Sequence, residues 1–160
     1  MTHDQTTWLT PSAHRKLQEE LEDLTTRGRQ EISERIAEAR SHGDLRENAD
    51  YDAAKNEQGL MEARIRKLQH LLDTAEVREA SDSGAVEVGS VVTVTRAADG
   101  GEMEVFVAPP ENKVPGFVLA SPSSPLGGAL LGATVGDDVA YEAPGGTFTV
   151  TVTAIRPYEG

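Results

Sequence analysis

Two carboxylates, Asp44 and Glu47, stand in the nonapeptide Gly-Asp-Leu-Arg-Glu-Asn-Ala-Asp-Tyr of residues 43–51, between two long stretches of helical periodicity. The spacing Asp-x-x-Glu at a helix start is that of a capping box, in which both side chains accept hydrogen bonds from backbone N–H groups. Two exposed carboxylates can also hold a hard cation such as Mg²⁺, which takes oxygen ligands. The spacing alone does not choose between a cap and a metal site. Because two carboxylates cannot complete an octahedral shell, a metal here would share its ligands with substrate, water or another protein.

Basic residues lie near these acids, at Arg35, Arg40, Arg46 and Lys55. The simpler interpretation is that they are solvated charges on helix faces, and the sequence alone favours it. The functional interpretation is a small positive spot that grips a phosphate backbone weakly. The four histidines have no metal-ligand spacing, and no serine lies in a nucleophile motif. We therefore expect no self-sufficient catalytic pocket, and a protein that is not itself an enzyme.

Composition narrows the class of protein. The chain of 160 residues has no cysteine, which excludes disulfides and thiol-based metal or redox chemistry. It has no apolar run of about 18 residues and no secretion signal at its start, so we expect a cytoplasmic protein with no membrane contact. The net charge of −12 argues against a module that binds DNA by neutralising phosphates. Twelve of the 15 Lys and Arg residues lie in residues 1–78, so any contact with an anion belongs to that half.

Two helices must position the acids. Thr10 and Pro11 are typical of an N-cap and a first helical residue, and no proline follows before Arg40. Apolar residues recur at helical spacing in this first stretch, with a break in the heptads near Gly28: Leu17, Leu21, Leu24, Ile32, Ile36 and Ala39. The second stretch alternates steps of three and four without error: Tyr51, Ala54, Gln58, Met61, Ile65, Leu68, Leu72 and Ala75. The short connection between them forces an antiparallel hairpin about 45 Å long.

In the second half of the chain, apolar residues recur at every second position, as in a strand. Strands are expected over residues 90–96, 103–108, 116–120, 139–141 and 147–154, with a short helix over 126–131. Pro144-Gly145-Gly146 supplies the turn of a final antiparallel hairpin. Trp8 is expected to anchor the base of the hairpin. The predicted fold is α+β: a coiled-coil hairpin over residues 1–79 with its acidic tip at 43–51, a linker over 80–86, and a small antiparallel sheet domain with one helix over 87–160.

Residues 43–51, followed by Ala53-Ala54-Lys55-Asn56-Glu57-Gln58, resemble the hairpin tip of the Gre transcript cleavage factors of bacteria. Residues 124–132 and Pro144-Gly145-Gly146 resemble the second domain of that family, so the resemblance spans nearly the whole chain. It implies an FKBP-like second domain that grips the rim of the secondary channel of RNA polymerase, at Ser124, Pro125 and Leu126, while the hairpin enters the channel.

The resemblance also assigns roles at the tip. Asp44 and Glu47 would help to hold the second Mg²⁺ of the polymerase, and the isolated chain would bind no metal tightly. Arg40 and Lys55, with Arg46 beside them, fall where the family keeps basic residues facing the 3′ end of backtracked RNA. The implied partners are thus RNA polymerase and the RNA 3′ end, and the implied protein is a monomer. The negative net charge of the chain favours the branch of the family that cuts short backtracked fragments.

One segment departs from the family pattern: Ala108-Pro109-Pro110-Glu111-Asn112-Lys113-Val114-Pro115 is rich in proline. This leaves rim docking less well supported than the tip chemistry. Two other classes of protein compete with a cleavage factor. One is a regulator that occupies the channel and inhibits without promoting cleavage, of which altered tip acids are the usual mark. The other is a plain coiled-coil adaptor, in which Asp44 and Glu47 only cap a helix.

Overall fold

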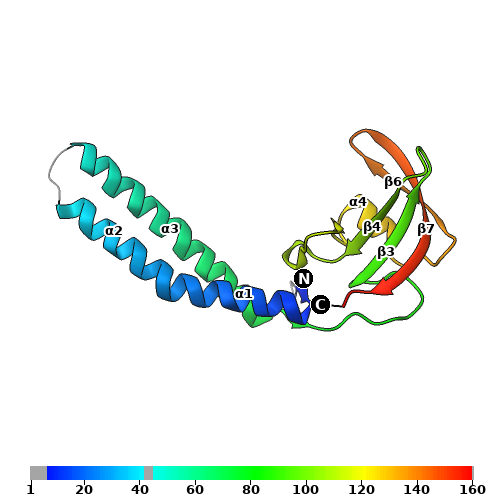
Figure 1. Cartoon of the computed structure of the whole chain (residues 1–160), viewed down its shortest axis with the longest axis horizontal. Coiled ribbons are helices and arrows are strands. Elements are labelled where there is room, and N and C mark those ends of the chain that lie inside the picture. The colour runs from blue at the N-terminus through cyan, green and yellow to red at the C-terminus, as the bar shows by residue number, and fades with distance from the viewer. Residues whose placement is uncertain (1–6, 42–44, 160) are drawn as a thin grey trace, which may run out of the picture. The chain divides into compact units, whose positions relative to one another are not determined.

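The computed structural model describes residues 7–41 and 45–159, and for residues 45–48 the backbone only. The chain forms two compact units. One, the hairpin unit, is His14–Thr74, and the other, the sheet unit, joins Met1–Ala13 to Ala75–Gly160. This arrangement confirms the predicted α+β class, with a helical hairpin and a small sheet carrying one short helix (Figure 1). Among the described residues, no helix has the length and apolar content needed to cross a bilayer.

The first arm of the hairpin comprises α1 (Pro11–Asp23), the short π-helix η1 (Leu24–Gly28) and α2 (Arg29–Ser41), and the second arm is α3 (Leu45–Thr74). Thr10 caps α1 as predicted, because its Oγ1 accepts a hydrogen bond of 3.0 Å from the Ala13 N–H. The predicted seam is confirmed: its residues on both arms are buried or half-buried, with Ile32, Ala54, Ile65 and Leu68 among the most enclosed.

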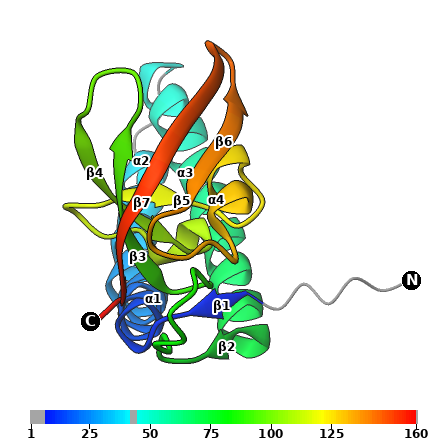
Figure 2. The same cartoon turned by 90° about the vertical axis from the view of Figure 1, so that its right-hand side faces the viewer.

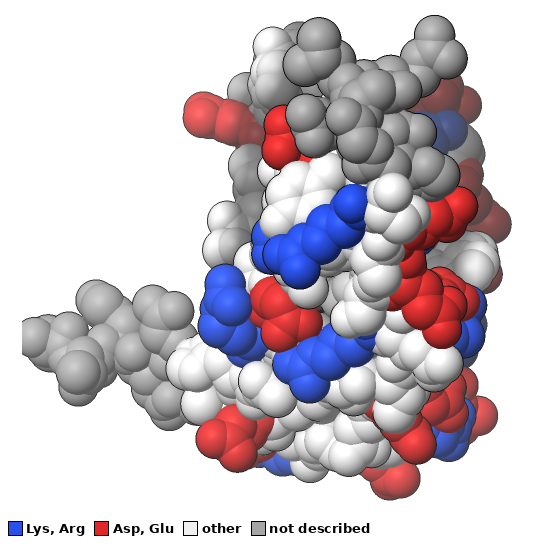
Figure 3. Space-filling model, turned by 90° about the vertical axis from the view of Figure 1, so that its left-hand side faces the viewer, with Lys and Arg blue, Asp and Glu red and all other residues white. Residues whose placement is uncertain are grey.

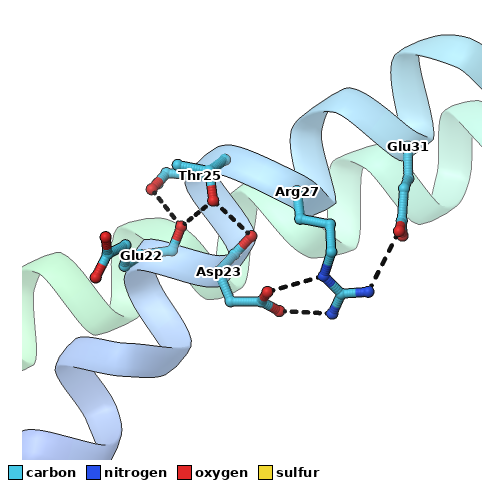
Figure 4. Close-up of polar contacts among 6 residues, drawn as sticks. Glu22, Asp23, Thr25, Arg27 and Glu31 are labelled. Carbon is cyan, nitrogen blue, oxygen red and sulfur yellow. Dashed lines mark hydrogen bonds and ion pairs between the residues drawn. The ribbon is translucent and has the colours of Figure 1, made fainter.

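The break in the heptads has a structural cause in η1. Leu24 and Ile32 are eight residues apart, and η1 takes up the extra residue so that both stay in the seam. Two threonine hydroxyls donate to carbonyls of the preceding turn, at 2.9 Å from Thr25 to Leu21 and 2.7 Å from Thr26 to Glu22. On the solvent side, the Arg27 guanidinium binds Asp23 through two bonds of 2.9 Å and reaches Glu31 at 3.2 Å (Figure 4).

Gly28, the last residue of η1, offers a test of this local packing. A Cβ added there would lie 3.1 Å from the Met61 Sδ, whereas at Gly59 it would meet nothing within 4 Å. Alanine is favoured over glycine in a helix by about 1 kcal/mol, and the flexible, half-buried Met61 side chain can move by a few tenths of an ångström. We expect Gly28→Ala to raise the melting temperature of the hairpin unit, but by less than the control Gly59→Ala. A lower melting temperature for Gly28→Ala would mean that Met61 is held rigidly.

The sheet unit is built on five strands in the order β5-β4-β3-β7-β6. The long strand β7 and its partner β6 lie side by side in Figure 2. Their bounds are β3 (Ser90–Arg96), β4 (Glu102–Val107), β5 (Val118–Ala120), β6 (Asp138–Ala143) and β7 (Gly146–Pro157). The short helix α4 (Pro125–Leu130) packs beside β6. All neighbours are antiparallel except β4 and β5, which pair in parallel. The predicted antiparallel sheet is thus confirmed for β3, β4, β6 and β7, and β5 adds a parallel edge, where the 3-10 helix η2 (Pro110–Asn112) forms part of the crossover.

Apolar side chains pack on both faces of the sheet. One cluster contains valines of β3, β4 and β7 with Leu130 of α4. A second cluster on the other face contains Val91, Phe106 and Ala108, with Trp8, Phe117 and Tyr158 packed against it. The alternation predicted for β7 holds at Val150 and Val152 and fails at Ala154, which is exposed. The reason is a bulge at Thr153, which shifts the register with β3 so that Ile155 faces the first cluster instead.

Two short strands join the ends of the hairpin. β1 (Trp8–Leu9) pairs in parallel with β2 (Glu76–Val77), in the register Trp8↔Glu76 and Leu9↔Val77. The Glu76 N–H donates to the Thr7 carbonyl at 2.9 Å, and the Arg78 N–H donates to the Leu9 carbonyl at 3.1 Å. β1 immediately precedes α1 and β2 immediately follows α3, so both ends of the hairpin meet at one small ladder.

Candidate functional site at the closed end of the hairpin

The closed end of the hairpin carries the nonapeptide with the two acids. α2 ends at Ser41 and α3 begins at Leu45, so the backbone of Arg46 and Glu47 belongs to the first turn of α3. Asp44 lies outside the described residues, as do the side chains of Arg46 and Glu47. In sequence, Asp44 directly precedes the first helical residue and Glu47 is the third, which is the spacing of the predicted capping box, and the cap stays a prediction. The partial positive charge of a helix N-terminus also favours a carboxylate at that position.

Two of the predicted basic residues gather around Tyr51, one from each arm. The Arg40 Nη2 of α2 lies 3.4 Å from the Tyr51 hydroxyl of α3, and the Arg40 Cζ lies 5.6 Å from the centre of the Tyr51 ring. This hydrogen bond, with the positive charges of Arg40 and Lys55, lowers the pKa of the Tyr51 phenol. Lys55 also donates from its Nζ to the Gln58 Oε1 at 3.0 Å. Tyr51 thus contacts Arg40 across the hairpin and lies near the charge of Lys55, a role that its seam position alone did not indicate.

Arg35, the fourth basic residue, is paired across the hairpin with Glu57. It also lines a surface hollow of about 300 Å³ between α2 and α3, together with Glu38, Ala39, Asp50, Ala53 and Ala54. Figure 3 looks toward the closed end of the hairpin and shows basic and acidic side chains interspersed rather than separated into patches. The positive charge available to an anion therefore centres on Arg40 and Lys55 rather than on Arg35. Among the described residues, no group of three His, Asp or Glu side chains could hold a metal ion.

Ion pairs between the arms hold the helices below the closed end. Arg64 binds Glu20 through bonds of 2.7 and 2.9 Å, and Arg29 binds Glu62 through bonds of 2.9 and 3.1 Å. In each pair the hydrogen bonds from the arginine lower the pKa of the glutamate. Because the folded-state pKa is depressed, each pair stabilises the hairpin above the ordinary glutamate pKa of 4.5. That stability is lost as the pH falls from 4.5 through the folded-state value.

The Glu20–Arg64 pair makes this pH dependence measurable. Both side chains are about 40% exposed, so solvent screening limits the pair to below about 1 kcal/mol. We expect Glu20→Gln to lower the melting temperature of the hairpin at neutral pH and to have a smaller effect below pH 4.5. Thermal melts across a pH series check this, with Glu19→Gln, at an exposed neighbouring position, as the control. An equal effect of Glu20→Gln at every pH would contradict the electrostatic explanation.

The predicted docking residues, Ser124, Pro125 and Leu126, form the start of α4 in the sheet unit. The Ser124 Oγ caps this helix, accepting from the Gly127 N–H at 3.1 Å and donating to the Ser121 carbonyl at 2.7 Å. Pro125 is exposed at the first helical position, and Leu126 packs partly against the first cluster. A Cβ on Gly127 would lie 2.0 Å from the Ser121 carbonyl oxygen, so only glycine fits there. These residues thus have complete structural roles, and their docking role stays a prediction.

Comparisons with known proteins agree across the chain. The family model described as "Transcription elongation factor, N-terminal" matches residues 7–77, and the one described as "Transcription elongation factor, GreA/GreB, C-term" matches residues 81–157. Transcription elongation factor GreA of Streptomyces coelicolor is 47% identical, over 99% of this chain and 98% of that protein. The GreA of Mycobacteroides abscessus is also 47% identical, over 99% of each chain. A solved structure of the transcription factor Gfh1 is 31% identical, covering 98% of this chain and 99% of that one, with a TM-score of 0.45.

Proposed function

Because the chain belongs to the GreA/GreB family of transcription elongation factors, we propose that it enters the secondary channel of RNA polymerase and stimulates cleavage of backtracked RNA. The chemistry would belong to the polymerase, and this chain would act as an accessory factor without an active site of its own. The observation that supports the proposal is the placement of Glu47, three residues after Asp44, in the first turn of α3 at the closed end of a two-helix hairpin.

The hairpin has the dimensions that this role requires. α3 has 30 residues and is therefore about 45 Å long, and two packed helices are about 20 Å wide. A rod of this width could enter a channel that is too narrow for a globular domain. The seam and the ion pairs between the arms make the hairpin a stiff support for its closed end. The sheet unit would then remain at the channel rim, with Ser124, Pro125 and Leu126 as its candidate docking residues.

The tip acids would complete a metal site that they cannot form alone. Two carboxylates supply at most part of an octahedral Mg²⁺ shell, and the remaining ligands would come from the polymerase, the RNA and water. In a two-metal site, one ion activates the attacking water and the other stabilises the leaving oxygen. A factor that delivers two carboxylates to a loosely held ion would raise the occupancy of that ion. Mg²⁺ would thus be shared with the polymerase, and Asp44 and Glu47 would act in trans.

The basic spot would hold the RNA in place. Arg40 and Lys55 lie on different arms. Arg40 contacts Tyr51, whose phenol also feels the charge of Lys55, and Arg46 belongs to the first turn of α3 between them in sequence. Side chains of this kind bind phosphate groups through charge, with little dependence on base sequence. We therefore propose that they hold the 3′ end of backtracked RNA near the tip acids, and that a single copy of the chain acts on each polymerase in the cytoplasm.

The experiment is a fragment-release assay. RNA polymerase stalled in a backtracked complex is labelled at the RNA 3′ end and incubated with Mg²⁺, with and without the protein. The expected result is the rapid release of short 3′ fragments, followed by renewed elongation when nucleotides are added. Inhibition of ordinary elongation without any fragments would instead identify a channel-occupying inhibitor. If neither cleavage nor inhibition appears, the chain does not act in the channel.

The Arg40–Tyr51 contact gives a graded prediction. Tyr51→Phe keeps the ring beneath the guanidinium and removes the hydroxyl, whereas Tyr51→Leu keeps an apolar seam residue and removes both contacts. We expect the protein concentration needed for half-maximal cleavage to rise about two- to threefold for Tyr51→Phe, and further for Tyr51→Leu and Arg40→Ala, because the guanidinium loses its support. Titrations at several salt concentrations check the order. Equal values for all three variants and the unaltered protein would show that Arg40 does not contact the RNA.

A further inference from the structure

The proline-rich segment of residues 108–115 contains a buried amide that the proposed function does not use. Asn112 is the last residue of η2 and is 1% exposed. Its neighbours in the segment fix it from both sides, because Ala108 is buried in the second cluster and Val114 packs against the same cluster. The Asn112 N–H and its Nδ2 both donate to the Pro109 carbonyl, at 3.0 and 3.2 Å. The side chain is therefore held in one orientation by its own segment.

That orientation directs the amide at β1. The Asn112 Nδ2 donates to the Trp8 carbonyl at 2.8 Å, and the Asn112 Oδ1 accepts from the Thr10 N–H at 2.8 Å. More than 100 residues separate these partners in sequence. Thr10 is 3% exposed and Leu9 is fully buried, so water cannot replace these bonds. One side chain thus satisfies two backbone groups on either side of Leu9.

Both ends of the hairpin depend on residues 8–10, to which Asn112 is hydrogen-bonded. Thr10 receives the Asn112 bond and, through its Oγ1, caps the first turn of α1 at Ala13. β1 pairs with β2, which directly follows α3, through the bonds from Glu76 and Arg78. We propose that the proline-rich segment is a clasp that fastens both ends of the hairpin within the sheet unit, and that Asn112 is a positioning residue for the tip.

The proposal rests on the proposed function for its consequence, though not for its geometry. Asn112 contacts neither the RNA nor the metal in this scheme, and acts only by fixing the residues from which the hairpin starts and to which it returns. A displacement of about 1 Å at a reacting centre can cost about 100-fold in rate. We therefore expect Asn112→Ala to reduce the maximal cleavage rate at saturating protein by about 10- to 100-fold, with binding to the polymerase retained.

The experiment compares the full chain with Asn112→Ala and Asn112→Asp, and with Asn56→Ala at an exposed position of α3 as the control. Trp8, the single tryptophan of the chain, reports the clasp directly, because its carbonyl accepts the Asn112 bond and its ring packs against the second cluster. For Asn112→Ala we expect a red-shifted, more readily quenched Trp8 emission with unchanged helical circular dichroism. Unchanged emission would overturn the clasp.

Asn112→Asp serves if the alanine variant fails to fold. The aspartate keeps the acceptor for the Thr10 N–H but, when ionised, cannot donate to Trp8. Protonation restores one donor, so its Trp8 emission should return toward that of the unaltered protein as the pH falls, and emission that stays unchanged across the pH series would contradict the clasp. A maximal cleavage rate equal to that of the unaltered protein would overturn the positioning role. If the unaltered protein releases no fragments, the proposed function fails, and the Trp8 emission still decides the clasp.

Discussion

Replacing both tip acids by amides, Asp44→Asn with Glu47→Gln, should reduce stimulated cleavage of backtracked RNA by at least about 10- to 100-fold. Outer-shell partners of metal ligands already cost that much when they are changed, and a ligand itself should cost no less. The amides keep the size and hydrogen-bonding shape of the carboxylates but bind Mg²⁺ far more weakly. Single-turnover fragment release over a range of Mg²⁺ concentrations measures the effect, and the variant should need more Mg²⁺ for half its own maximal rate.

The control for net charge is Glu19→Gln with Asp73→Asn, two exposed positions of the hairpin far in sequence from the tip. This variant loses the same two charges and should cleave as the unaltered protein does. The two variants together distinguish a metal-assisting role from helix capping. The amides retain the cap, because Asn and Gln accept the same backbone hydrogen bonds. If the tip variant retains full cleavage, the acids only cap α3, and the adaptor interpretation is the correct one.

Phe106→Ala should have the largest effect on stability, lowering the free energy of unfolding of the sheet unit by about 3–5 kcal/mol. Phe106 is fully buried at the centre of the second cluster, where its ring stacks on Tyr158 at 4.6 Å and meets Phe117 edge-on at 6.3 Å. Removing the ring leaves a cavity that β4 cannot close, because the strand is paired on both sides. Urea unfolding followed by Trp8 emission, which reports the same cluster, gives the measurement.

Phe148→Ala is the matched control for this prediction. Phe148 is 40% exposed near the end of the sheet and contacts Tyr141 at a ring distance of 5.8 Å. Its removal should cost far less than the loss of Phe106, since much of its surface is already in water. A similar loss for the two variants would show that the second cluster contributes little to stability.

The fold was predictable where the apolar residues of a segment recur with a single helical or strand period. The steps of three and four from Tyr51 to Ala75 predicted α3, and the valine- and threonine-rich residues 90–96 predicted β3 with its observed bounds. Elements that depend on partners far along the chain were not predictable. β1 and β2 have two residues each, too few for a pattern, and they exist only because they pair with each other. The bulge at Thr153 likewise depends on the register with β3, which reverses the alternation of β7 beyond it.

The candidate site shows the same division. The residue types and spacing of Asp44 and Glu47 predict either a helix cap or part of a metal site, and both roles stay predictions. The contact of Arg40 with Tyr51 could not be predicted, since it depends on the rotation of one arm against the other. Asn112 was missed for a related reason. The role of this buried asparagine depends on its hydrogen bonds to Trp8 and Thr10, which are about 100 residues away in sequence.

The pairing of β1 with β2 makes the hairpin an insertion whose two ends leave and rejoin the sheet unit side by side. Such an insertion can be exchanged as a cassette. Adding seven residues to each arm would preserve the seam and lengthen the hairpin by about 10 Å, and removing seven would shorten it by as much. A series of such length variants would measure a distance. The arm length that gives the highest activity would report how far the docking surface lies from the centre on which the tip acts.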